Sequence, residues 1–155
     1  AARADIGAVL VAPAPDRRIS GRGSPRAGRH LLPERDAARL LADRDAADLL
    51  PRDDVERLAI HDRGRDRYLI ASAQGIHRAA IYRLDAAGAH CVALVGVAAG
   101  TVDGVTETDG LDVTAAALPG YPQGLLVMMD DQNAGFSTNF KLIDWAAIAA
   151  GLPPR

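Results

Sequence analysis

Residues 101–113 read Thr-Val-Asp-Gly-Val-Thr-Glu-Thr-Asp-Gly-Leu-Asp-Val and join two groups of expected strands. The stretch holds two Asp-Gly pairs, which form tight turns because Gly adopts positive φ and Asp bonds its own backbone. It also holds four acidic side chains within ten residues, Asp103, Glu107, Asp109 and Asp112. A hard cation such as Ca²⁺ would relieve their repulsion. The spacing differs from that of an EF-hand loop, and spacing alone favours a solvated acidic turn between two strands.

Short apolar runs lie on both sides of this acidic stretch. They cover residues 55–61, 68–72, 79–84 and 91–97 before it, and 112–116, 124–129 and 140–143 after it. Turn-forming residues, Gly above all, separate most of these runs. Short strands at this spacing predict an all-β sandwich, barrel or propeller. Residues 53–97 fit one four-stranded propeller blade, and residues 101–143 fit part of another.

The two ends of the chain differ from this pattern. Residues 6–12 form an apolar run of strand type, and residues 34–49 have the spacing and composition of a helix that ends before Pro51. Residues 1–52 are therefore expected to be a separate N-terminal segment. At the other end, Asp144 is expected to cap a helical turn over residues 144–150.

Composition excludes several classes of protein. The 155 residues are 48% hydrophobic with a net charge of −2, which predicts one globular domain without the basic face of a nucleic-acid binder. No apolar run is long enough to span a bilayer. Cys91 is the single cysteine, so no internal disulfide is expected. The chain lacks the apolar core of a signal peptide and does not begin with Met, so a processed form or a fragment is expected.

Four blocks in the last two-thirds of the chain resemble the β-propeller phytase family. They are Asp54-Val55-Glu56 with Leu58-Ala59-Ile60, then 68–75 (Tyr-Leu-Ile-Ala-Ser-Ala-Gln-Gly) with Ala80-Ile81-Tyr82, then 103–113, and last Tyr121-Pro122, Gly124-Leu125, Asp130, Asn133 and Asn139-Phe140-Lys141 before Trp145. Each block alone is weak, but all four in this order and at these gaps are specific. The resemblance implies about three blades of a six-bladed β-propeller, with residues 53–155 as its C-terminal blades and a helical insertion near the N-terminus.

The resemblance also implies a function. The family hydrolyses phosphate monoesters of phytate, myo-inositol hexakisphosphate, with Ca²⁺ ions that bind the phosphates and activate a water. Carried over by position, the expected catalytic and calcium-binding residues are Asp54, Glu56, Gln74 and Asp103, with Asn133 and Asp109 as further calcium ligands. If Asp54 and Glu56 lie on a strand, their spacing puts both side chains on one face.

Alternatives remain open for these residues. Asp54 and Glu56 also suit the polar face of an edge strand, and Gln74 and Asn133 also suit turns. The four histidines show no metal-ligand spacing and are assigned no chemistry. Tyr82, Phe140 and Trp145 are expected to pack in the core or between blades.

Two functions therefore follow from the sequence. The first is a calcium-dependent 3-phytase, or part of one, acting on small inositol phosphates, secreted or periplasmic, and monomeric if its propeller is complete. Neither nucleic acid nor a membrane is expected as a partner. The second is a non-catalytic, calcium-stabilised propeller remnant that serves as a binding or structural module. Convergence of Asp54, Glu56, Gln74 and Asp103 at one end of the strands would favour the first function. The missing basic residues of the earlier blades, and Ala4 where the resemblance implies a ligand Glu, would favour the second.

Overall fold

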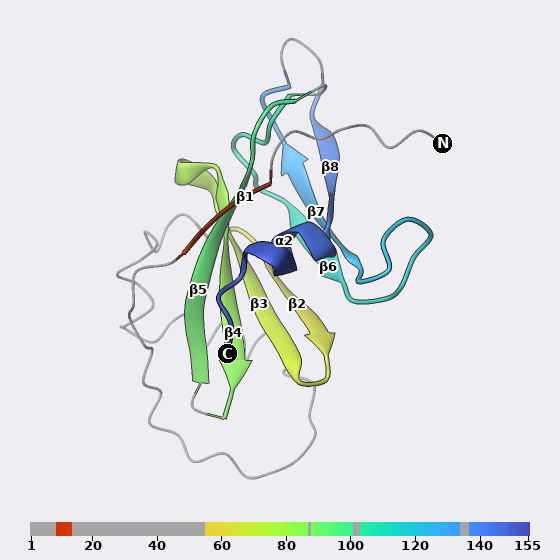
Figure 1. Ribbon diagram of the computed structural model, residues 1–155. Helices are drawn as coiled ribbons and strands as arrows, with labels where there is room; N and C mark the ends of the chain where they lie inside the picture. The colour runs from red at the N-terminus through yellow and green to blue at the C-terminus, as the bar shows by residue number, and fades with distance from the viewer. Residues whose placement is uncertain (1–8, 14–54, 87, 101–102, 134–136) are drawn as a thin grey trace.

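Two antiparallel sheets and one short helix make up the described structure, a computed structural model that covers residues 9–13, 55–86, 88–100, 103–133 and 137–155 (Figure 1). The elements are β1 (Val9–Pro13), β2 (Leu58–Arg63), β3 (Asp66–Ala73), the 3-10 turn η2 (Gln74–Ile76), β4 (Arg78–Asp85), β5 (Gly88–Val97), β6 (Leu111–Thr114), β7 (Leu125–Asp130), β8 (Asn139–Asp144) and α2 (Trp145–Gly151). For the described residues, the sequence pattern therefore predicted a mostly antiparallel β structure correctly.

The first sheet has the strand order β1-β5-β4-β3-β2, and the second has the order β6-β7-β8. Strands β2 to β5 follow one another as an antiparallel meander, which is the arrangement predicted for one blade of residues 53–97. Strand β1 comes from the N-terminal segment and pairs with β5, with Val9 opposite Val97. The second sheet supplies three strands of the expected second blade.

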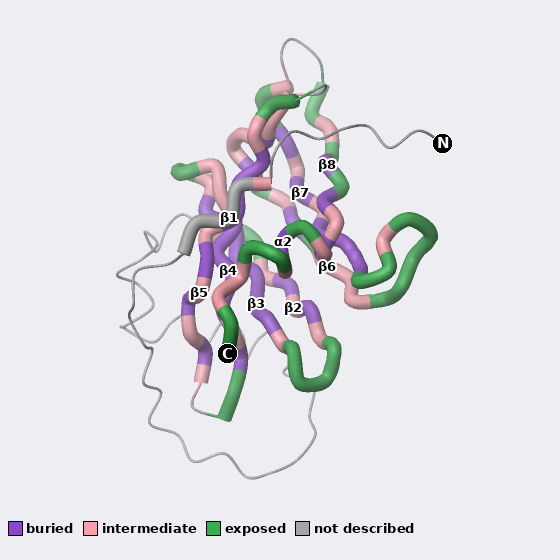
Figure 2. The backbone as a smooth tube through the Cα atoms, in the orientation of Figure 1, coloured by how far each residue is buried: buried purple, intermediate pink, exposed green. Residues whose placement is uncertain are grey.

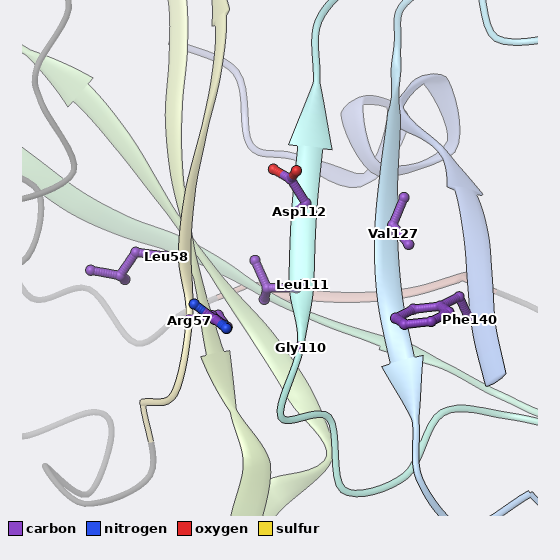
Figure 3. Close-up of a pocket in the computed structure, with 7 residues that line it drawn as sticks. All are labelled: Arg57, Leu58, Gly110, Leu111, Asp112, Val127 and Phe140. Carbon is purple, nitrogen blue, oxygen red and sulfur yellow. The ribbon is translucent and has the colours of Figure 1, made fainter. Parts of the chain in front are cut away.

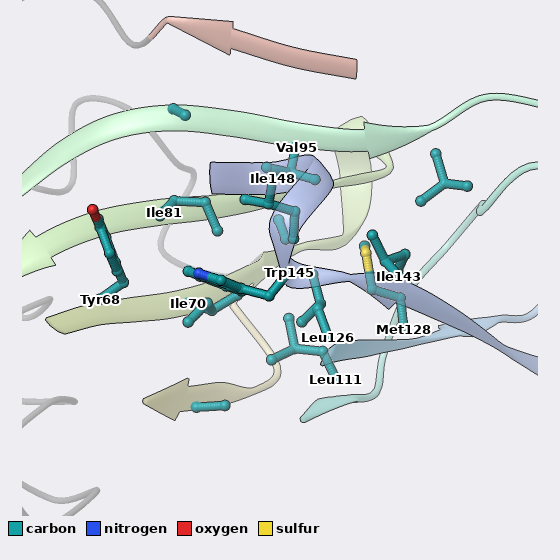
Figure 4. Close-up of a cluster of buried hydrophobic side chains, with 14 of the residues drawn as sticks. Tyr68, Ile70, Ile81, Val95, Leu111, Leu126, Met128, Ile143, Trp145 and Ile148 are labelled. Atoms are coloured by element: carbon teal, nitrogen blue, oxygen red, sulfur yellow. The ribbon is translucent and has the colours of Figure 1, made fainter. Parts of the chain in front are cut away.

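The main hydrophobic core lies between the two sheets (Figure 4). Side chains alternate along a strand, so Tyr68 and Ile70 of β3 face this core together with Leu126 and Met128 of β7. Trp145, at the start of α2, lies among them with only 2% of its surface exposed. The helix begins where Asp144 Oδ1 accepts a hydrogen bond from the Ala146 amide at 3.0 Å, which confirms the predicted N-cap.

His61 of β2 belongs to the same core. Its ring stacks on Trp145 with a centroid distance of 3.8 Å and an interplanar angle of 11°. His61 Nε2 lies 3.0 Å from the Gln123 carbonyl oxygen, and a carbonyl oxygen can only accept, so Nε2 donates. Burial lowers the pKa of His61 from 6.5 despite that hydrogen bond, which raises it. His61 therefore packs in the core.

The second face of the first sheet is also buried (Figure 2). Leu69, Ala71 and Ala80 line it together with Tyr82, which is completely buried. A sheet buried on both faces explains why the run from Leu69 to Ala73 is almost continuously apolar instead of alternating.

Three expectations need correction or stay open. Phe140 is not a core residue, because it is 64% exposed; it pairs with Met129 on the outward face of the second sheet. Residues 55–57 precede β2 instead of forming part of it. The predicted helix at 34–49 lies outside the described residues and stays a prediction.

Within the described residues, no helix has the length and apolar character needed to cross a bilayer.

Candidate functional site

The loops that carry the predicted ligands lie at one end of both sheets, which is the upper end of each sheet in Figure 1. In the first sheet, β2 and β4 begin where β3 and β5 end, because Leu58 pairs with Ala71 and Ala79 pairs with both Ser72 and Val95. In the second sheet, the start of β6 and the end of β7 lie together, with Leu111 opposite Met128. The described residues 55–57, 74–77, 98–100, 103–110, 131–133 and 137–138 therefore share this end of the molecule.

The segment before β2 is held there by a buried serine. Ser72 Oγ accepts hydrogen bonds from the backbone amides of Glu56 and Arg57, both at 2.9 Å, and the Ser72 amide donates to the Arg57 carbonyl oxygen at 3.0 Å. The Glu56 side chain is left exposed. Because residues 55–57 are not in a strand, the strand-spacing argument for placing Asp54 and Glu56 on one face does not apply.

A hydrogen bond between two strained residues joins the β3–β4 turn to the acidic loop. His77 follows η2 with a φ of 54°, and Glu107 has a φ of 43°; within the described residues, these are the non-glycine residues with positive φ. The Glu107 amide donates to His77 Nδ1 at 2.9 Å. Such conformations cost free energy and persist only where surrounding contacts hold them. This contact therefore places the loop beside Gln74, which begins η2.

The acidic loop is also packed closely onto the two sheets. The Val105 amide donates to the Val97 carbonyl oxygen at 3.1 Å, and the Met129 amide donates to the Gly110 carbonyl oxygen at 2.7 Å. A Cβ at Gly104 would lie 2.6 Å from the Val97 carbonyl oxygen, so only glycine fits there. The loop is thus anchored at both ends and is more than a solvated turn.

Lys141 of β8 lies between two carboxylates at this end. Lys141 Nζ is 2.5 Å from Asp103 Oδ1 and 3.1 Å from Asp130 Oδ2. The second contact is an ion pair without hydrogen-bond geometry, since Asp130 Oδ2 has no hydrogen-bond partner. Asp130 is completely buried, and its Oδ1 accepts hydrogen bonds from the Thr106 amide and hydroxyl, both at 3.1 Å. These residues couple the acidic loop to β7 and β8.

The charges in this cluster stabilise one another. The hydrogen bond from Lys141 holds the pKa of Asp103 below its usual 3.8. Burial by itself would lower the pKa of Lys141, but the hydrogen bond that Lys141 donates to Asp103 and the attraction of the Asp103 and Asp130 carboxylates outweigh burial and raise it. Lys141 therefore remains an ammonium and Asp103 a carboxylate at neutral pH.

A separate pocket of about 340 Å³ lies beside this end, between the start of β2 and the second sheet (Figure 3). Its lining residues are Arg57, Leu58, Gly110, Leu111, Asp112, Val127 and Phe140. The lining combines apolar side chains with the charged Arg57 and Asp112 and includes none of the predicted ligands, so the loop end with its carboxylates is the candidate site.

Comparison with known proteins identifies the family. A family model described as phytase matches residues 33–154. The chain belongs to the phytase family. A 3-phytase of Bacillus subtilis (strain 168) is 32% identical over 105 residues, which are 64% of this chain and 28% of that protein. The match thus spans little more than a quarter of the relative's length.

The structure places most of the ligands suggested by the phytase resemblance. Glu56, Gln74, Asp103, Asp109 and Asn133 all lie in the loops at the shared end, whereas Asp54 lies outside the described residues. Asn133 Nδ2 donates to the Ser137 carbonyl oxygen at 3.0 Å, and Asp109 is exposed. Their roles as ligands stay predictions.

A calcium site at this end would need donors beyond acidic side chains. Within the described part of the chain, no three His, Cys, Asp or Glu side chains come close enough to hold a metal by themselves. The chemistry of the donors nevertheless fits a hard cation: Asp103 Oδ2 is shielded from solvent without a hydrogen-bond partner, and amide oxygens lie in neighbouring loops.

Sequence reasoning missed the residues that organise this cluster. Asp130 and Lys141 stood only as part of the family resemblance, and Thr106 and Ser72 were given no role. One signal was available for Lys141: it is the only lysine among 18 Lys and Arg residues. The lysine ammonium is a compact cation, and Lys141 lies between two carboxylates.

Proposed function

We propose that this chain forms part of a calcium-dependent phytase that releases phosphate from myo-inositol hexakisphosphate. The observation that carries the proposal is the family match over residues 33–154. The shared loop end that holds Glu56, Gln74 and Asp103 supports it. The two sheets would be blades of a six-bladed propeller, in a monomeric protein that is secreted or periplasmic, where calcium is abundant.

Charge supports the need for a cation. The described acidic residues in the loops of this end are Glu56, Asp103, Glu107, Asp109 and Asp131, whereas the bases are Arg57 and Arg78 at the edges of the loops. Phytate is strongly anionic and would be repelled by this surface. Bound calcium would supply the positive charge that holds phosphate and lowers the pKa of a water for attack on phosphorus.

The residues of this chain would divide the work as follows. Asp54, Glu56 and Asp103 would be calcium-binding carboxylates, and Gln74 would bind calcium or orient the attacking water through its amide. Asn133 and Asp109 would complete the calcium shell. Ser72, through its bonds to the Glu56 and Arg57 amides, would hold Glu56 in place, and no covalent nucleophile is required.

A second candidate is a non-catalytic module that binds calcium for stability. In the described loops of this end the cationic side chains are Arg57 and Arg78, at the edges, which leaves few groups to hold phosphate and favours this candidate. The two functions differ in one observable: both raise the melting temperature in calcium, but only the first releases phosphate from phytate.

The test is phosphate release from phytate in millimolar calcium and in excess chelator, with p-nitrophenyl phosphate as a comparison substrate. We expect release from phytate in calcium and none in chelator. Calcium at a hundredfold excess over its Kd would stabilise the fold by about 2.7 kcal/mol, which for a chain of this length raises the melting temperature by about 5–10 °C.

Asp103→Asn should remove most of the calcium-dependent stabilisation, because the amide keeps the shape of the side chain but loses its charge. Asp112→Asn is the matched control, since Asp112 is exposed and its Oδ1 accepts a hydrogen bond from the adjacent Val113 amide. Equal calcium responses of the two variants would reject Asp103 as a ligand. Phosphate release that persists in chelator would reject calcium dependence.

A further inference from the structure

The cluster of Asp103, Lys141 and Asp130 already contains one cation. The Lys141 side chain is 6% exposed, the Asp130 side chain is completely buried, and the Asp103 side chain is 31% exposed. The cluster thus extends from the core to the surface: Asp130 is innermost, the Lys141 ammonium lies in the middle, and Asp103 lies nearest to solvent. Its formal charge is −1 as long as all three groups are ionised.

The two carboxylates are held differently. Asp130 is also held through its Oδ1 by the amide and hydroxyl of Thr106, so its position does not depend on the contact between Lys141 and Asp103. Asp103 Oδ1 has Lys141 as its hydrogen-bond donor, and Asp103 Oδ2 has no hydrogen-bond partner. Of the two contacts that Lys141 makes, the one to Asp103 is therefore the one that can change when another cation arrives.

We propose that Lys141 sets the calcium affinity of the site by competing with Ca²⁺ for the Asp103 carboxylate. This inference rests on the proposed function, in which Asp103 is a calcium ligand. A divalent ion on Asp103 would lie within a few ångströms of the ammonium, and like charges at that distance repel strongly. Calcium binding must therefore weaken the contact between Lys141 and Asp103 and leave Asp130 as the remaining partner of Lys141.

The competition has a structural consequence as well. With Lys141 present, Asp130 keeps a counter-ion whether or not calcium is bound, so the junction of the acidic loop with β7 and β8 does not depend on metal. Without Lys141, Asp130 would be a buried charge with no cation, which is strongly destabilising. Calcium would then be needed for stability as well as for chemistry.

The first experiment is calorimetric titration of calcium into the chain and its variants. Lys141→Gln removes the competing charge and should tighten calcium binding by about tenfold or more, while lowering the melting temperature in chelator. Lys141→Arg retains the charge and should stay within about threefold of the parent. Arg67→Gln is the matched control, because it makes the same change of charge at the Asp62–Arg67 pair, 3.0 Å apart on the first sheet.

A second experiment uses the parent protein and does not depend on the folding of any variant. Because Lys141 is the only lysine, ¹⁵N-lysine labelling gives a single side-chain ammonium signal. We expect calcium to shift this signal and to speed exchange of its protons with water, as the contact with Asp103 weakens. Asp103→Asn should remove the response.

The outcomes separate this inference from the proposed function. Calcium binding that is equal or weaker in Lys141→Gln, or an ammonium signal that stays unchanged while calcium binds, overturns the competition alone. Calcium binding that is absent, or is unaffected by Asp103→Asn, overturns both the competition and the role of Asp103 as a ligand.

Discussion

Replacing Ser72 with alanine tests whether a buried hydroxyl positions the loop that carries Glu56. Ser72 Oγ accepts two backbone hydrogen bonds at 2.9 Å, from Glu56 and Arg57, and the residue has no exposed surface. Alanine removes this acceptor and keeps only the Cβ atom of the side chain. The substitution adds no atoms, so no clash is introduced.

The expected loss of stability follows from the two hydrogen bonds. Each contributes about 0.5–1.5 kcal/mol net, and the two amides are only partly buried, so water can replace some of what is lost. We expect a decrease of about 2 kcal/mol in the free energy of unfolding. For a chain of this length that corresponds to about 4–8 °C in melting temperature.

The measurement is urea unfolding followed by the fluorescence of Trp145, the single tryptophan, which is 2% exposed. Thr138→Ala is the control, since it removes an exposed hydroxyl whose partner is Asp131 Oδ1 at 3.0 Å, and it should change stability by less than about 0.5 kcal/mol. If Ser72→Ala unfolds at the same urea concentration as the parent, the serine does not hold the loop. If the variant is destabilised but binds calcium normally, Glu56 does not depend on this anchor.

Two further predictions concern the core and a turn. Burial lowers the pKa of His61 in the folded protein from 6.5. At acidic pH the His61 imidazole is therefore protonated more readily in the unfolded chain than in the folded one. Its contribution to stability is complete above pH 6.5 and is lost as the pH falls through the folded-state pKa. His61→Phe keeps the stack on Trp145 but cannot titrate, and its urea midpoint should fall less than the parent's between pH 7 and pH 5; parallel curves would contradict this. Gly124 has a φ of 89°, and a Cβ there would lie 1.9 Å from the Thr114 carbonyl oxygen, so Gly124→Ala should cost about 2 kcal/mol or more. Gly120→Ala, at a φ of 84° with nothing within 4 Å of the new atom, should cost only the conformational strain of about 1 kcal/mol, and equal losses in urea unfolding would refute the steric argument.

Local patterns along the sequence determined where the strands lie. Alternating and continuous apolar runs, separated by Gly and Asp, located β2 to β8 to within a few residues, because these signals depend on neighbours along the chain. Asp144 as the N-cap of α2 is of the same kind. The boundary of β2 was misjudged because the residues before it bond to the Ser72 side chain, which is far away in the sequence.

Burial of individual side chains and the pairing of charges depended on the tertiary structure. Phe140 is exposed because the register of β8 against β7 turns it outward, and a shift by one residue would have buried it. Residues 103, 130 and 141 are widely separated in the sequence, and only the docking of the acidic loop against β7 and β8 brings Asp103 and Asp130 to the two sides of Lys141. The sequence by itself determined the elements and the types of donor atoms at the candidate site. The packing of the two sheets decided which carboxylate is shielded with a cation and which one faces the surface, because that choice depends on contacts between distant segments.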